Sequence, residues 1–91
     1  MPIFLVATRK NNDQLDSELM HRFPEDVLRI AGNQWLVSAS MNTGRLAEVI
    51  DPGEGGKWGN LIVVAAGNYS GWHELDTWEW IDQKRSAGRR G

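Results

Sequence analysis

The chain of 91 residues is long enough for one small domain, because two separate cores would each be near the size at which chains need disulfides or metals to fold. Its 41% hydrophobic and 24% charged residues exclude a disordered or low-complexity protein, and the absence of cysteine excludes disulfide frameworks, thiolate metal sites and cysteine nucleophiles. The net charge of −2 conceals an acidic body, since all 12 acidic residues lie at or before Asp82, and such a body disfavours nucleic acid as a partner.

The sequence predicts no targeting or membrane segment. Every apolar run is shorter than the roughly 20 residues that a membrane-spanning helix requires. The N-terminus, Met1-Pro2-Ile3-Phe4, lacks the positively charged start of a signal peptide. Together with the absence of cysteine, these features predict a cytoplasmic protein without membrane contact.

The chain begins with a predicted strand and helix. Residues 3–8 form a short apolar run rich in β-preferring side chains, which is typical of a central strand buried on both faces. Asn12 or Asp13 can cap the helix that follows, and Pro24 ends it. The apolar stripe of this helix consists of Leu15, Leu19, Met20 and Phe23.

A β-hairpin is the strongest local prediction. Residues 26–31 and 34–39 are two strand-like runs. Between them stands Gly32-Asn33, the kind of pair that adopts positive φ angles and closes a two-residue turn.

The second half of the chain predicts another helix and strand. A short helix begins at Asn42 or Thr43 and ends before Pro52. The glycine-rich loop 53–59 leads into residues 60–67, a continuous apolar run that predicts another buried strand. This loop follows a helix and precedes a strand, an order opposite to that of a phosphate-binding loop.

A C-terminal helix completes the pattern. Asp76-Thr77-Trp78-Glu79 has the spacing of a capping box, and apolar residues recur about every three positions around it. Residues 86–91, rich in glycine and arginine, are expected to form a disordered basic tail behind a single domain of residues 1–85.

The predicted order, β-α-β-β-α-β followed by a helix, is that of an α+β ferredoxin-like sandwich with an appended C-terminal helix. Two helices on one face of the sheet leave the other face open to water. We expect Trp72, Trp78 and Trp80 to lie over that face, either in the same chain or across a second copy, which makes a homodimer the natural expectation.

This layout resembles the small ferredoxin-like proteins related to CRISPR-associated protein 2 and to virulence-associated protein D. The resemblance covers residues 3 to 67 and rests on element order and on the strands Gln34-Trp35-Leu36-Val37 and Leu61-Ile62-Val63-Val64-Ala65. It implies a homodimer with packed sheet faces. Nuclease members carry a metal-binding aspartate near the end of the first strand, whereas Leu5-Val6-Ala7-Thr8-Arg9 has no acid before Asp13, which argues against metal-dependent cleavage.

The polar cluster after the first strand is the main candidate binding site. Arg9 and Lys10, with Arg45 nearby, can bind an anion or a nucleic-acid backbone, although an ordinary solvated loop has the same composition. Trp58, on the glycine-rich loop, either pins that loop to the body or contacts a partner. The chain has no Gly-x-Ser-x-Gly motif and only two histidines, so we expect no catalytic residue, metal or cofactor.

The sequence therefore predicts a non-catalytic protein-interaction or regulatory module that acts as a homodimer. The alternative is a nucleic-acid-binding protein or degenerate metal-dependent nuclease of the resembled family, acting through Thr8, Arg9, Lys10 and Arg45. A third hypothesis is a small-molecule site near Tyr69 and Trp72. The candidate binding residues are Arg9, Lys10, Arg45, Trp58, Tyr69, Trp72 and Trp78.

Overall fold

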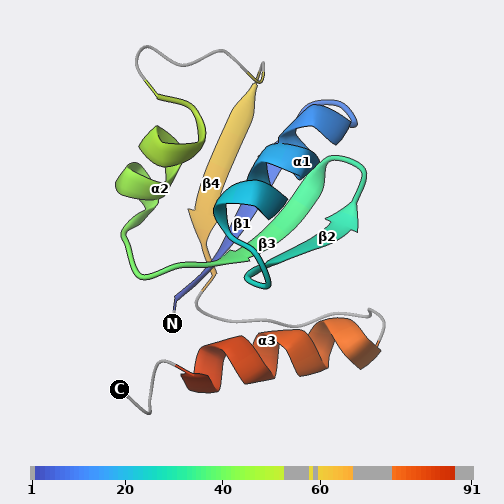
Figure 1. The fold of residues 1–91 in the computed structure, drawn as a ribbon, viewed down its shortest axis with the longest axis vertical. Coiled ribbons are helices and arrows are strands. Elements are labelled where there is room, and N and C mark those ends of the chain that lie inside the picture. Colours follow the sequence, from blue (N-terminus) through green and yellow to red (C-terminus); the bar gives the residue numbers. More distant parts are fainter. Residues whose placement is uncertain (1, 53–57, 59, 67–74, 88–91) are drawn as a thin grey trace.

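The computed structural model describes residues 2–52, 58, 60–66 and 75–87, which form one antiparallel four-stranded sheet and three helices (Figure 1). In chain order the elements are β1 (Ile3–Thr8), α1 (Asp13–Arg22), β2 (Val27–Ala31), β3 (Gln34–Ser38), α2 (Thr43–Ile50), β4 (Leu61–Ala65) and α3 (Leu75–Ala87). The strand order is β2-β3-β1-β4, so the first strand is central, as predicted. This α+β architecture is compatible with a ferredoxin-like sandwich.

Helix α1 begins where its cap predicts. The Asn12 side chain accepts a hydrogen bond from the Leu15 backbone N–H at 2.9 Å, and the last turn closes with the Phe23 N–H on the Leu19 carbonyl. Leu15 and Leu19 are fully buried, but Met20 is 44% exposed. The prediction of Met20 as part of the apolar stripe is wrong, because a step of one residue from Leu19 turns it about 100° around the helix.

The predicted hairpin is present, but its turn differs from the prediction. Gly32 does not have a positive φ, and Glu25 is the one described non-glycine residue that does. The ladder instead shifts register between Arg29 and Ala31, which is a bulge in β2. A Cβ at position 32 would meet the end of the exposed Asn11 side chain, which would have to turn aside.

Helices α1 and α2 cover one face of the sheet. The core between them includes Phe4 and Val6 of β1, Trp35 and Val37 of β3, Leu15 and Leu19 of α1, and Leu46 and Ile50 of α2. Helix α2 begins after Asn42, whose side chain accepts a hydrogen bond from the Arg45 N–H. Both caps were among the alternatives predicted from the sequence.

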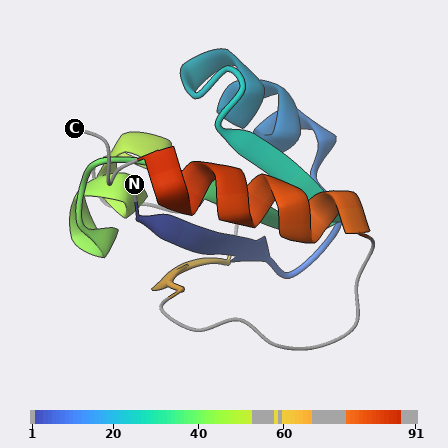
Figure 2. The same cartoon turned by 90° about the horizontal axis from the view of Figure 1, so that it is seen from below.

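Helix α3 covers the opposite face, within the same chain (Figure 2). Ile81 is buried against Ile3 and Leu36, and Trp80 is half-buried beside them. The helix begins at Leu75, so the predicted cap Asp76 lies inside its first turn. It also continues to Ala87, so its last two residues are helical and do not belong to the predicted tail. No helix in the described part of the chain is long and apolar enough to cross a membrane.

Strand β4 corrects the prediction of another buried strand. It lies at the edge of the sheet and runs only from Leu61 to Ala65. Leu61 and Val63 pack against the core under α2, whereas Ile62 is 58% and Val64 44% exposed. The two exposed residues lie on the face that α3 occupies, but α3 crosses the sheet over the other strands, and β4 lies beside it in Figure 2.

Candidate functional site

The connection between β1 and α1 is fixed to the β2–β3 turn by short hydrogen bonds. The Thr8 N–H donates to the Asn33 carbonyl at 2.9 Å, and the Asn33 side chain donates back to the Thr8 carbonyl at 3.0 Å. The Asn12 N–H donates to the Gly32 carbonyl at 3.1 Å, and the Thr8 hydroxyl donates to the Lys10 carbonyl at 2.7 Å. The backbone that carries Arg9 and Lys10 is therefore held in one conformation.

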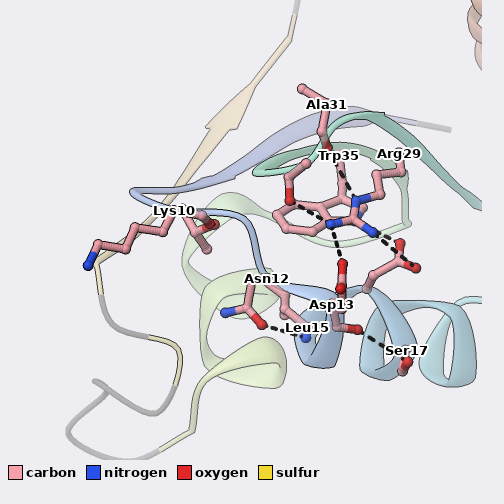
Figure 3. A network of polar contacts seen from close by, with 11 residues as sticks. Lys10, Asn12, Asp13, Leu15, Ser17, Arg29, Ala31 and Trp35 are labelled. Carbon is pink, nitrogen blue, oxygen red and sulfur yellow. Dashed lines mark hydrogen bonds and ion pairs between the residues drawn. The ribbon is translucent and has the colours of Figure 1, made fainter.

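This connection forms one wall of an open depression of about 680 Å³, which we call the basic depression. The described residues that line it are Arg9, Lys10, Asn11, Asn12, Trp58 and Asn60. Arg9 and Lys10 are exposed, and neither makes an ion pair within the described part of the chain. Figure 3 shows the Lys10 side chain extending away from the neighbouring polar network. The depression thus combines two cationic side chains, three amides and an indole.

Trp58 belongs to both the core and the depression. Its indole Nε1–H donates to the Ile50 carbonyl at 2.9 Å, at the end of α2, and its half-buried ring packs against the core. This contact supports the interpretation that Trp58 pins its loop to the body. The same ring lines the basic depression, so the pinned indole is also a fixed aromatic wall there.

The remaining predicted binding residues do not join the depression. Arg45 lies on α2 with its side chain 64% exposed and its Nη1 3.6 Å from a Glu48 carboxylate oxygen, and it is not among the lining residues. Trp78 lies in α3, but its side chain is outside the described part, and Tyr69 and Trp72 are outside the described residues.

A polar network lies under the first turn of α1 (Figure 3). The Arg29 guanidinium is 5.4 Å from the Trp35 ring centre and 2.9 Å from an Asp13 carboxylate oxygen. Asp16 accepts a hydrogen bond from the Trp35 indole at 2.9 Å and lies 3.7 Å from Arg29. The acidic side chains of the α1 first turn are therefore engaged by Arg29 and Trp35, on the β2 side of the molecule.

The acidic residues and histidines do not form a metal-binding group in the part of the chain that the structure describes. Nowhere in it do three His, Asp or Glu side chains come together.

The second candidate feature is the edge strand β4, which sequence reasoning missed. Ile62 and Val64 pair with Ala7 and Leu5 of β1, and this makes a contiguous apolar strip on the α3 face. A second depression of about 290 Å³ lies at the end of β1 and β4 and shares Arg9 and Asn60 with the basic depression. Residues 60–66 contain no charged residue or proline, which an exposed edge strand usually carries, so no local signal in the sequence indicates an exposed edge.

No protein-family model and no curated protein matches this chain. The resemblance to the CRISPR-associated and virulence-associated proteins therefore stays a prediction, and functional inference depends on the geometry of the basic depression and of β4.

Proposed function

We propose that the protein is a non-catalytic, cytoplasmic interaction module of the ferredoxin-like class that acts as a homodimer. The observation that carries this proposal is the exposed apolar edge formed by Ile62 and Val64 of β4. Contiguous apolar surface of this kind on a small domain is typical of an interface with another chain.

The fold supports the ferredoxin-like class that we propose. Strands in the order β2-β3-β1-β4, with α1 and α2 packed on one face, are compatible with the split β-α-β arrangement. Helix α3 covers Ile3 of β1 and Leu36 of β3 with its own Ile81, so this part of the face does not need a second copy to bury it. The dimer surface that we propose is therefore β4, instead of the aromatic face that the sequence favoured.

The experiment is sedimentation equilibrium of the full chain at several concentrations. We expect a monomer–dimer equilibrium, and we expect Val64→Lys to weaken association at least about tenfold, because a charge opposite an apolar surface must be desolvated. Met20→Lys is the matched control, since Met20 is also 44% exposed but lies on α1. A wild-type chain that stays monomeric at every concentration contradicts the proposal.

The second candidate function is binding of single-stranded nucleic acid in the basic depression. It is supported by Arg9, Lys10 and Trp58 lining one hollow, because strands of this kind are bound by cations along the backbone and by stacking on aromatic rings. The acidic body weighs against high affinity.

Fluorescence anisotropy with a labelled oligonucleotide tests this second candidate. If it is correct, binding weakens as salt increases, and the double variant with Arg9→Ala and Lys10→Ala loses about tenfold in affinity or more. Arg45→Ala, which removes an exposed cation outside the depression, should leave the affinity within about twofold. Equal losses in the double variant and in Arg45→Ala, or no binding by the wild type, exclude the depression as a nucleic-acid site.

A further inference from the structure

The hydrogen-bonding direction of each β4 residue follows from the ladder with β1. Residues 3, 5 and 7 of β1 stand opposite 66, 64 and 62, and the Ala66 N–H donates to the Ile3 carbonyl at 2.9 Å. Opposite residues in an antiparallel pair alternate between hydrogen-bonded and non-hydrogen-bonded. Positions 62, 64 and 66 therefore direct their backbone groups to β1, and Leu61, Val63 and Ala65 direct theirs away from the sheet.

The β1–β3 ladder gives the same assignment independently. The Thr8 N–H donates to the Asn33 carbonyl and the Ala39 N–H donates to the Pro2 carbonyl, so the even residues of β1 bond to β3. The odd residues of β1 are then the ones that bond to β4. The outward backbone groups of Leu61, Val63 and Ala65 make no other interaction within the described residues.

The outward backbone groups of these three residues can form hydrogen bonds with the same groups of a second copy. We propose that two copies pair along β4 as antiparallel neighbours, with Val63 of one copy opposite Val63 of the other, which extends the sheet across both copies. In this register Leu61 faces Ala65 of the second copy, so all three outward residues form hydrogen-bonded pairs. If the register between the two copies shifts by two residues, one of the three outward residues has no partner. If it shifts by one residue, backbone groups that point away from the sheet face residues whose backbone groups already bond to β1.

The same register buries the exposed side chains. Between the hydrogen-bonded pairs, Ile62 of one copy stands opposite Val64 of the other in a non-hydrogen-bonded pair, where side chains are closest. The strip on the α3 face then continues from Leu5 and Ala7 of one copy to those of the second. Because residues 60–66 carry no charge, two identical edges meet without repulsion, which favours a second copy over a charged partner.

This inference rests on the proposed homodimer and specifies its interface. Disulfide cross-linking tests the register, and the chain has no native cysteine to interfere. We expect a mixture of the Ile62→Cys and Val64→Cys chains to give about tenfold more cross-linked dimer than either chain alone. In the proposed register the mixed pair has Cα atoms about 4.5 Å apart, within disulfide range, while the like pairs are diagonal neighbours at about 7–8 Å. Met20→Cys mixed with either variant is the control and should stay at background.

The outcomes separate the two claims. Preferential cross-linking of the mixture supports the register. A wild-type chain that is dimeric by mass, with no excess of cross-linking in the mixture, overturns the β4 pairing and leaves the homodimer standing. A monomeric wild type overturns both, and it means that this edge is covered within the chain or by another protein.

Discussion

The two edge strands of the sheet, β2 and β4, differ in the features that prevent another strand from pairing with them. Strand β2 carries a bulge, turns the charged Arg29 inward over Trp35, and is flanked by an ion pair of 2.8 Å between Asp26 and Lys84 of α3. Strand β4 has a regular register, no charged residue, and two exposed branched side chains. Bulges and inward charges are devices that prevent strands from adding to an edge. Their presence at β2 and absence at β4 support the proposal that a second copy pairs along β4.

The largest effect is expected where α3 shields the sheet near β2. Ile81 is 7% exposed and packs on Ile3 and Leu36, so Ile81→Ala should lower the free energy of unfolding by about 2–4 kcal/mol. Urea denaturation at low protein concentration measures it. A loss below about 1 kcal/mol contradicts the packing of α3 on the sheet within one chain. The contrast between the covered side of the sheet near β2 and the exposed strand β4 then fails.

The inward charge of β2 should have a smaller effect. Arg29→Ala removes the contacts with Asp13, Trp35 and the Gly32 carbonyl, and we expect a loss of about 1–2 kcal/mol in the free energy of unfolding. Arg29→Lys keeps the charge but not the planar fork, and should recover less than half of that loss. Full recovery by lysine indicates that charge alone matters at this edge.

On the β4 side, the smallest effect on monomer stability is expected. Val64→Lys should change the free energy of unfolding by less than about 0.5 kcal/mol in dilute solution, because the side chain is exposed in a single copy. Thermal unfolding at low concentration, beside Met20→Lys, measures this. A large destabilisation of the dilute monomer means that Val64 is buried within its own chain, and then the contrast between the edges fails.

Much of the fold was predictable because local signals agreed with packing. The caps at Asn12 and Asn42, the apolar pairs of each helix and the Gly32-Asn33 break place the elements within one or two residues of the observed bounds. The turn type was not predictable, since the bulge in β2 and the approach of Asn11 to Gly32 depend on tertiary contacts.

The site was predictable only in part. Arg9, Lys10 and Trp58 are candidates from the sequence, and the structure brings them together because Trp58, hydrogen-bonded to the end of α2, lines the same hollow as the β1–α1 connection. Arg45 does not line it. The sequence does not predict the exposure of β4, because a continuous apolar run has the same pattern in a central strand as in an exposed edge strand.

Hydrogen–deuterium exchange of the β4 amides, measured at low and high protein concentration, tests the central claim most directly. The N–H groups of Ile62 and Val64 bond to β1 and should be protected at both concentrations. Those of Leu61, Val63 and Ala65 should exchange freely in dilute solution and become protected as concentration rises. Protection of these three amides that does not change with concentration would contradict pairing between two copies along β4.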